Sequence, residues 1–259
     1  MSNISTPESY IDAQEKLMTL NLLQMAFKNF ETLESFRSYL YNNGVVISVA
    51  NLSRYINGKA IPKSKLKDTL LKILINNEEL GLSIKELIAS HLDIKTDNFG
   101  NISVNNTYLL NDSKTLKAIL FLAIQQGIIP READKVITAE VDGIPIAMTL
   151  AHLLNIDCVY ARKKKPVGTQ EFLSEDIITT SSSRLETLYF PEKFIRKSEK
   201  VIIIDDIIRS GATQTALVNL VNKCEGIPLK IIILTGIGEH WEKTTKLRLT
   251  EFKVLYAIN

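Results

Sequence analysis

Two adjacent acids, Asp205 and Asp206, stand between an apolar run and a turn of small residues. The run, residues 201–204, is rich in β-branched side chains, which is typical of a parallel strand buried on both faces. The turn leads through Gly211 into apolar residues at helical spacing. A helix N-terminus after a tight turn offers free N–H groups and a positive dipole end to a phosphate. Acids at the strand end can hold ribose hydroxyls, so the segment predicts a ribose-phosphate site.

Residues 201–213 resemble the phosphoribosyl-pyrophosphate (PRPP) motif of type I phosphoribosyltransferases, in which four hydrophobic residues precede two acids and a Thr/Ser-Gly-x-Thr turn. The resemblance implies that Asp205 and Asp206 hydrogen-bond the ribose 2′- and 3′-hydroxyls, and that they are catalytic if the protein is an enzyme. It also implies that the turn wraps the 5′-phosphate. The turn consists of Arg209, Ser210, Gly211, Ala212 and Thr213.

Three further stretches are similar to the same family. Val141, Asp142 and Gly143 correspond to its pyrophosphate loop, where a glycine lets backbone amides approach an anion. Arg162 and Lys163 follow a predicted strand at the place of the basic pair that meets pyrophosphate. Residues 167–179 occupy the position of the loop that closes over the active site. The resemblance implies Mg²⁺ as cofactor, held through PRPP and not by the protein directly.

The elements that must position these residues alternate between helix and strand. Helices are expected at 113–127 and 144–154, and strands at 135–140, 157–161 and 230–235, besides the strand and helix of the PRPP motif. This alternation predicts an α/β domain, residues 107–259, with a parallel sheet covered by helices on both faces. Ligands of such sheets lie beyond the carboxyl ends of the strands.

Residues 1–95 are predicted to form an all-helical domain. Two helices fit residues 10–42, and Ser48 can cap a short helix whose inward side chains would be Val49, Leu52 and Ile56. Further helices are expected at 63–75 and 83–92. The polar segment 95–106 is expected to be a linker between the two domains.

Residues 47–62 resemble the recognition-helix region of repressor-like helix-turn-helix domains, with a Ser-Arg-Tyr-x-x-Gly-Lys-x-x-Pro pattern. The candidate DNA-binding residues are Asn51, Ser53, Arg54, Asn57, Lys59 and Lys63. Charge supports this interpretation, because six cations between residues 54 and 72, Lys67 among them, face Asp68 alone. The alternative is a helical dimerisation or lid domain with a solvated basic face.

The composition fits a soluble globular protein, with 45% hydrophobic and 23% charged residues. A net charge of +2 requires any DNA-binding surface to be local. Cys158 and Cys224 lack metal-type spacing, and no run is long enough for a membrane helix, so a cytoplasmic protein is expected.

Together the two halves are similar in plan to archaeal regulators that join a helix-turn-helix to a phosphoribosyltransferase-like domain, and to the bacterial purine operon repressor. This resemblance implies a homodimeric transcription regulator that binds double-stranded DNA and senses PRPP or a purine nucleotide. The alternative is a purine or orotate phosphoribosyltransferase with an accessory helical domain. Asp142 favours the regulator, because an acid there would repel pyrophosphate, and Trp241 is expected to pack at a core edge more readily than to stack on a base.

Overall fold

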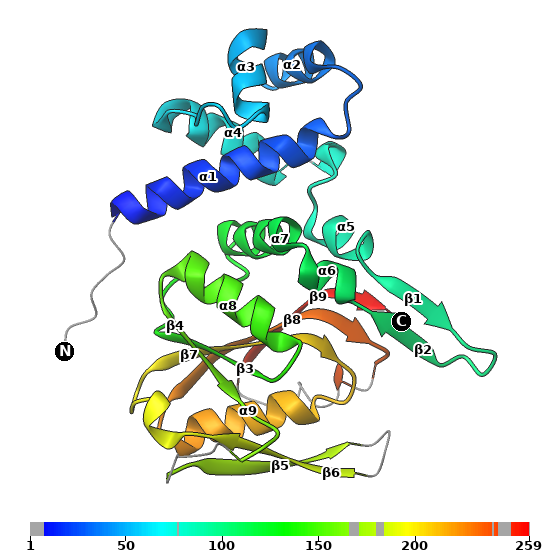
Figure 1. Cartoon of the computed structure of the whole chain (residues 1–259), viewed down its shortest axis with the longest axis vertical. Helices are drawn as coiled ribbons and strands as arrows, with labels where there is room; N and C mark the ends of the chain where they lie inside the picture. Colours follow the sequence, from blue (N-terminus) through cyan, green and yellow to red (C-terminus); the bar gives the residue numbers. More distant parts are fainter. Residues whose placement is uncertain are drawn as a thin grey trace.

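The computed structural model describes residues 8–76, 78–165, 171–179, 184–239, 241–242 and 250–258. Helices gather at one end of the elongated molecule, and a sheet with its covering helices forms the other end (Figure 1). No helix within these described ranges combines the length and the apolar character needed to cross a membrane.

The helical end contains α1 (Glu8–Phe27), α2 (Leu33–Asn42), α3 (Val49–Ile56), α4 (Ser64–Asn76) and α5 (Ile84–Ala89), with a 3₁₀ turn at Glu78–Leu80. Hydroxyl caps fix three of the helix starts. The side chains of Thr32, Ser48 and Ser83 each accept a hydrogen bond from the backbone N–H three residues later. The helix expected after Ser48 is therefore confirmed.

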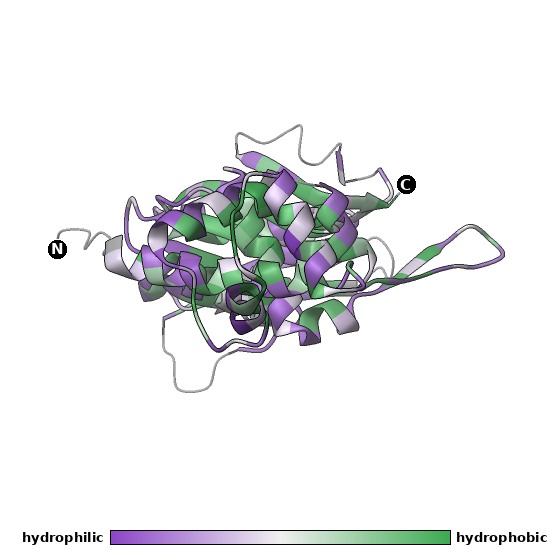
Figure 2. Ribbon diagram, turned by 90° about the horizontal axis from the view of Figure 1, so that it is seen from above, coloured by the Kyte–Doolittle hydropathy of each residue, from purple (hydrophilic) through white to green (hydrophobic). Residues whose placement is uncertain are grey.

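Residues 93–105 form a hairpin, and most of the segment 95–106 that was expected to be a linker lies within it. Strands β1 (Asp93–Thr96) and β2 (Ile102–Asn105) pair antiparallel and project from the body of the molecule (Figures 1 and 2). Asp97 organises the turn, because its Oδ1 accepts hydrogen bonds from the backbone N–H groups of Phe99 and Asn101. The polar composition that suggested a linker belongs instead to a solvated hairpin and its turn.

The sheet contains β3 (Lys135–Ala139), β4 (Asp157–Ala161), β7 (Lys200–Ile208), β8 (Ile227–Ile237) and β9 (Glu251–Ile258). These five strands are all parallel, in the order β4-β3-β7-β8-β9. Helices α6 (Thr107–Asn111), α7 (Ser113–Gln125) and α8 (Gly143–Leu154) lie on the side facing the helical end, and α9 (Ala212–Lys223) covers the other face (Figure 1). The expected parallel sheet with helices on both faces is confirmed.

A second antiparallel hairpin lies beyond α9. It consists of β5 (Leu173–Thr179) and β6 (Arg184–Phe190), and a short 3₁₀ turn at Glu192–Phe194 follows it. Residues 167–170 of the expected closing loop lie outside the described residues, and 173–179 form a strand where a loop was predicted. Hydrophobic side chains of this hairpin join the core on the α9 side of the sheet.

The larger core is continuous from the helical end into the sheet. Leu22 of α1, Leu52 of α3, Leu120 of α7 and Ile202 of β7 are fully buried members of the same cluster. Helix α7 is buried on nearly every side, which is typical of a helix enclosed between two layers. The helical region and the α/β region are thus packed against each other over a shared apolar interior.

Candidate functional site

The two acids of the PRPP motif lie in different environments at the carboxyl end of β7. Asp205 is buried, with 6% of its surface exposed, and Gln214 Nε2 donates a hydrogen bond to its Oδ2 at 2.7 Å. Burial and the neighbouring negative charge of Asp206 raise the pKa of Asp205 well above its ordinary value. The side chain of Asp205 is therefore a fixed part of the site's floor.

Asp206 is half-buried and lies on the side of the site next to the β1–β2 hairpin. Asn106 Nδ2, 100 residues earlier in the chain, donates a hydrogen bond to Asp206 Oδ2 at 2.6 Å. Asn106 itself is only 8% exposed. Of the two acids, Asp206 has the more accessible carboxylate, and the amide of Asn106 sets its orientation.

The phosphate turn predicted at residues 209–213 connects β7 to α9 in the structure. Gly211 precedes the first helical residue with φ of +77°, a conformation that side chains rarely adopt, so the turn requires glycine. The N–H groups at the start of α9 are then directed towards the turn, as an anion site requires. A cavity of about 620 Å³ adjoins this turn and is bounded by residues 100–102 of the hairpin and 237–239 after β8.

Arg209 is exposed and ties this turn to the hairpin. Its Nη2 donates a hydrogen bond to the backbone oxygen of Ile102 at 3.1 Å. Together with the bond between Asn106 and Asp206, this contact holds the base of the hairpin against the PRPP motif. The segment expected to be a linker therefore forms one wall of the candidate site.

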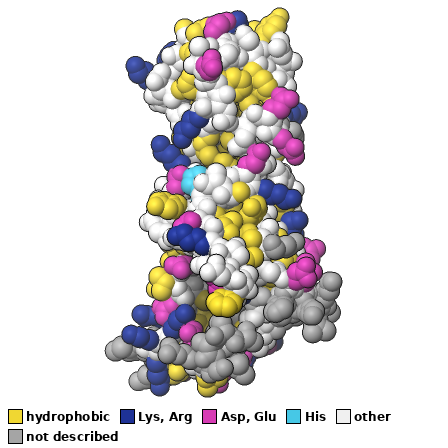
Figure 3. Space-filling model, turned by 90° about the vertical axis from the view of Figure 1, so that its right-hand side faces the viewer, with side chains coloured by type: hydrophobic (Ala, Val, Ile, Leu, Met, Phe, Trp, Pro, Cys, Tyr) yellow, Lys and Arg dark blue, Asp and Glu magenta, His cyan; other side chains and the backbone are white. Residues whose placement is uncertain are grey.

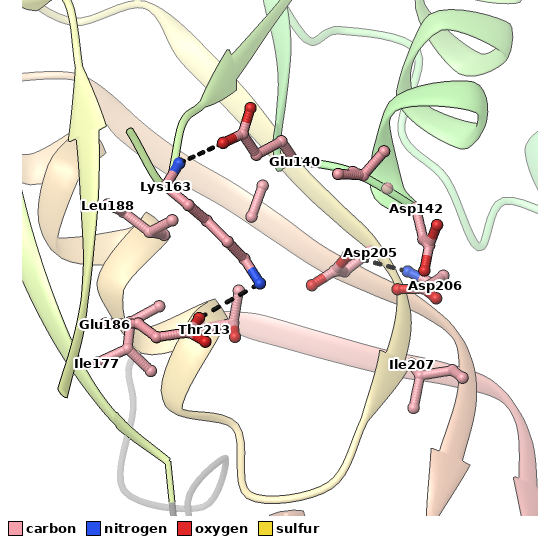
Figure 4. Close-up of a pocket in the computed structure, with 13 residues that line it drawn as sticks. Glu140, Asp142, Lys163, Ile177, Glu186, Leu188, Asp205, Asp206, Ile207 and Thr213 are labelled. Atoms are coloured by element: carbon pink, nitrogen blue, oxygen red, sulfur yellow. Dashed lines mark hydrogen bonds and ion pairs between the residues drawn. The ribbon is translucent and has the colours of Figure 1, made fainter. Parts of the chain in front are cut away.

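The predicted pyrophosphate loop lies next to the acids, at the start of α8. A second cavity, of about 210 Å³, is lined by residues 139–143, Lys163, Glu186, Asp205, Asp206 and Thr213, with Ile177, Leu188 and Ile207 (Figure 4). Gly143 is packed so tightly that a Cβ atom would stand 2.0 Å from Thr138 Oγ1 and 2.9 Å from Asp205 Oδ1. Glycine at this position lets the helix begin directly against the buried acid. The structure thus brings the PRPP motif and the pyrophosphate loop together.

Lys163 enters this second cavity between two carboxylates (Figure 4). Its backbone N–H donates to Glu140 Oε1 at 2.6 Å, and its Nζ lies 3.3 Å from Glu186 Oε2 on β6. Arg162 is not among the residues that line either of the two cavities, and its Nε lies 3.8 Å from Glu140 Oε2. Of the predicted basic pair, the lysine is the member placed at the cavity.

The hairpin that carries Glu186 is fastened to α9. Lys223 Nζ lies 2.6 Å from Glu175 Oε1, and Asn219 Nδ2 donates to Glu175 Oε2. Burial opposes ionisation of Glu175, but these hydrogen bonds outweigh it and lower its pKa. Strand β5 is therefore an anchored element of the α9 face.

The predicted DNA-binding residues lie on α3 and in the segment that follows it. Asn51, Arg54, Asn57, Lys59 and Lys63 are exposed, whereas Ser53 is half-buried. The amide of Asn57 donates to the backbone oxygen of Ser53 at 2.8 Å. The helix thus presents polar and basic groups to solvent from its first turn to the loop that follows it.

Two expectations about this region are corrected. Val49 is 40% exposed and not inward, whereas Tyr55, 9% exposed, packs inward beside Leu52. Lys67 is 5% exposed and contacts Asp12, Glu15 and Asp68, so it does not belong to the exposed basic surface. Charges of both signs are interspersed on the face shown in Figure 3.

Other polar groups near the site were not found from the sequence. Gln214 and Asn106 were missed because their partners become neighbours only on folding, although Gln214 stands just inside the predicted helix start. Glu186 lies within a strand, and nothing in the sequence around it indicated a role in the site.

Trp241 packs against Phe252 with ring centroids 5.8 Å apart, which agrees with its expected place at a core edge. Cys158 and Cys224 are free thiols, and burial raises the pKa of each to about 11.

Comparison with known proteins places the site in a recognised context. A model of the phosphoribosyl transferase domain matches residues 109–253. The chain is 32% identical over 93 residues to the purine biosynthesis transcriptional repressor PurR of Bacillus subtilis, covering 36% of this chain and 33% of that protein. It is also 32% identical over 133 residues to the adenine phosphoribosyltransferase of Brachyspira hyodysenteriae, covering 51% of this chain and 76% of that enzyme.

A third relative is the xanthine phosphoribosyltransferase of Deinococcus deserti, 32% identical over 96 residues, which are 36% of this chain and 49% of that enzyme. The chain thus spans a third of the repressor and about half of this enzyme. Among solved structures, adenine phosphoribosyltransferase from Thermoanaerobacter pseudethanolicus superposes with a TM-score of 0.59 at 23% identity, over 68% of this chain and all of that one. This likeness concerns the fold.

The matched residues 109–253 make up more than half of the chain and include the acids, the phosphate turn and the pyrophosphate loop, which converge in the fold. The chain therefore belongs to the phosphoribosyl transferase domain family.

Proposed function

We propose that this protein is a DNA-binding transcription regulator whose phosphoribosyltransferase-like region senses PRPP or a purine nucleotide. The observation that carries the proposal is the exposed face of α3, where Asn51 and Arg54 reach solvent while Leu52 and Tyr55 anchor the helix. A capped helix that follows a turn, as α3 does, suits insertion into the major groove of DNA. The relative PurR of Bacillus subtilis is a purine biosynthesis transcriptional repressor, which supports a regulatory role.

The proposed ligand site combines the acids with the two anion-binding loops. The ribose hydroxyls would meet Asp205 and Asp206, the 5′-phosphate would meet residues 209–213, and a pyrophosphate group would meet residues 141–143 and Lys163. No cluster of three or more potential metal ligands occurs within the described residues. Mg²⁺ would enter on PRPP, because magnesium commonly binds through one or two carboxylates and substrate phosphates.

The proposed DNA surface divides its work between base and phosphate contacts. Asn51, in the first turn of α3, has the amide that suits adenine in the major groove. Arg54, Lys59 and Lys63 supply exposed cations for the phosphates. In a homodimer, two copies of α3 would meet half-sites about 34 Å or a multiple of that apart.

Electrostatics at the pyrophosphate side work against rapid transfer. Glu140 and Glu186 contact Lys163 in the smaller cavity, and Asp142, Asp205 and Asp206 add further carboxyl groups to its lining. Catalysis of pyrophosphate departure requires groups that stabilise the charge developing on it. Acidic surroundings work against this, except where Mg²⁺ offsets them.

The second candidate function is a purine phosphoribosyltransferase. It is favoured by the adenine and xanthine phosphoribosyltransferases among the relatives and by the presence of both acids and the phosphate turn. The helical region would then be an accessory part of the enzyme.

Two assays on the full chain separate these functions. We expect the protein to bind the DNA upstream of its own gene in a mobility-shift assay at low salt, with an affinity that PRPP and Mg²⁺ change. We expect Arg54→Ala to weaken that binding about tenfold without altering PRPP affinity. Sustained consumption of adenine, guanine, hypoxanthine or xanthine with PRPP, and no shift of DNA, would instead identify the enzyme. Asp205→Asn with Asp206→Asn should weaken PRPP binding in either case, as measured by calorimetry.

A further inference from the structure

Helix α1 lies between α3 and α4 on one side and the α/β region on the other (Figure 1). Its first turns hold the end of α8. Tyr10 Oη donates a hydrogen bond to the backbone oxygen of His152 at 3.0 Å, and Gln14 Nε2 donates to the same oxygen at 3.0 Å and to Tyr10 Oη at 2.6 Å. His152 lies in the last turn of α8, so two side chains of α1 converge on one carbonyl there.

The opposite end of α8 forms part of the candidate ligand site. Gly143, its first residue, lines the smaller cavity and sits against Asp205 Oδ1 and Thr138. A regular helix transmits an axial or tilting movement along its length, which is about 18 Å for twelve residues. An anion that draws in the first N–H groups of α8 would therefore displace the carbonyl of His152.

The second half of α1 holds the end of the proposed recognition helix. Gln24 Nε2 donates to the backbone oxygens of Ile56 at 2.9 Å and Tyr55 at 3.5 Å, the final residues of α3. Between these contacts and those with His152, α1 is one unbroken helix whose inward residues Leu22, Leu23 and Ala26 are fully buried. Such packing makes the helix respond as a unit, because close-packed interiors transmit displacement.

We infer that α1 couples the ligand site to the DNA surface, with Tyr10 and Gln14 receiving the movement of α8 and Gln24 passing it to α3. These three are positioning residues, because none of them lines the ligand cavities and Gln24 acts on DNA only through α3. The inference rests on the proposed function, since it explains how a ligand at one end alters DNA binding at the other. By linkage, DNA bound at α3 would change ligand affinity by the same factor.

The test is amide hydrogen exchange of the full chain with and without PRPP and Mg²⁺, resolved at residues 209–215, at α8 and at α3. In the parent protein we expect ligand to slow exchange at 209–215 and to change exchange in α3 by about fivefold or more. Tyr10→Phe with Gln14→Leu should keep the response at 209–215 and abolish the response in α3. Gln24→Met, at the other contact, should keep the responses at 209–215 and in α8 and abolish only that in α3.

The matched control is Leu17→Gln, an exposed position on the same helix. It should behave as the parent, and thermal melts should show that every variant is folded. An α3 response that persists undiminished in both contact variants, or that is absent from a parent protein whose residues 209–215 do respond, would overturn the coupling while leaving the ligand site intact. Absence of any response at 209–215 would overturn the proposed ligand, and the coupling with it.

Discussion

At the scale of single residues, the adjacent acids of the PRPP motif show that neighbours in sequence can have different environments. Asp205 is enclosed and accepts hydrogen bonds from Gln214 and from the backbone N–H of Asp206, whereas Asp206 is half-buried and accepts one from Asn106. Enclosure and the charge of Asp206 raise the pKa of Asp205. The folded protein therefore retains a proton on this group at pH values where the unfolded chain has lost it.

This difference predicts a pH-dependent effect of Asp206→Asn. A raised folded-state pKa gives stability that is complete below the unfolded pKa and is lost as pH rises through the folded pKa. Because the substitution removes the charge that opposes ionisation of Asp205, the variant should lose less stability over that rise. We expect its free energy of unfolding to gain on that of the parent as pH rises above the ordinary pKa of an aspartate. Urea titrations at several pH values measure this difference, and a constant difference would contradict the assigned cause.

At the scale of elements, the β5–β6 hairpin matters because it delivers a carboxylate to the pyrophosphate side of the site. Glu186 lies on β6 and pairs with Lys163, while Glu175 on β5 is fastened to α9. A pyrophosphate bound at Lys163 would have to compete with Glu186 for the same ammonium group. The hairpin thereby lowers the affinity of the site for anions.

We therefore predict that Glu186→Gln strengthens pyrophosphate binding. The Glu186 and Lys163 side chains are 40% and 52% exposed, so their pair is worth at most about 1 kcal/mol and the gain should be about fivefold or less. Calorimetry with pyrophosphate and Mg²⁺ provides the measurement. Glu225→Gln, which breaks an exposed pair with Lys197 elsewhere, is the control, and equal affinities for the two variants would show that Glu186 does not compete.

Elements with strong patterns could be predicted from the sequence, and those defined by remote partners could not. The β7 strand, the turn at Gly211 and the cap at Ser48 follow from local chemistry, and the structure contains all three. The β1–β2 hairpin is polar because little of it is buried, so its composition resembled that of a linker. Val49 fits the spacing of an inward residue, but the fold turns Tyr55 inward instead.

The same division between local and remote features holds for the candidate site. The acids, the phosphate turn and Gly143 are local in sequence, so the motifs identified them and the fold brings them together. Asn106 and Glu186 reach the site from segments far away along the chain, and only the folded structure reveals them. Lys67 was counted as a solvent-facing cation because its three acidic partners include two on α1 that sequence spacing does not connect to it.

At the scale of the whole molecule, Lys67 joins α4 to α1 through ion pairs. Its Nζ lies 2.8 Å from Glu15 Oε2, 2.9 Å from Asp68 Oδ1 and 3.3 Å from Asp12 Oδ1. Burial disfavours its charge, but the hydrogen bonds that Lys67 donates to these acids outweigh that effect and raise its pKa. This cation therefore stabilises the packing of the helical end.

Lys67→Met should destabilise the protein by about 2 kcal/mol, less than for a fully enclosed pair because Asp12 and Asp68 are partly exposed. Because the folded pKa is raised, the stability that Lys67 contributes is present through neutral pH and is lost only in strong alkali. Denaturant titrations at pH 7 measure the loss. Under native conditions DNA affinity should match the parent, in contrast to Arg54→Ala, and a weakened DNA complex would mean that Lys67 meets phosphates after all.

The enclosure of α7 also bears on how this protein can be divided for experiments. Residues from Thr115 to Ile124 are buried on nearly all sides, with α1 and α5 on one side and α8 on another. A fragment beginning at residue 107 would keep the sheet and every ligand-binding motif but would expose the apolar flank of α7 to water. We therefore expect such a truncation to self-associate. A fragment intended for crystallisation should retain α1, which packs against α7.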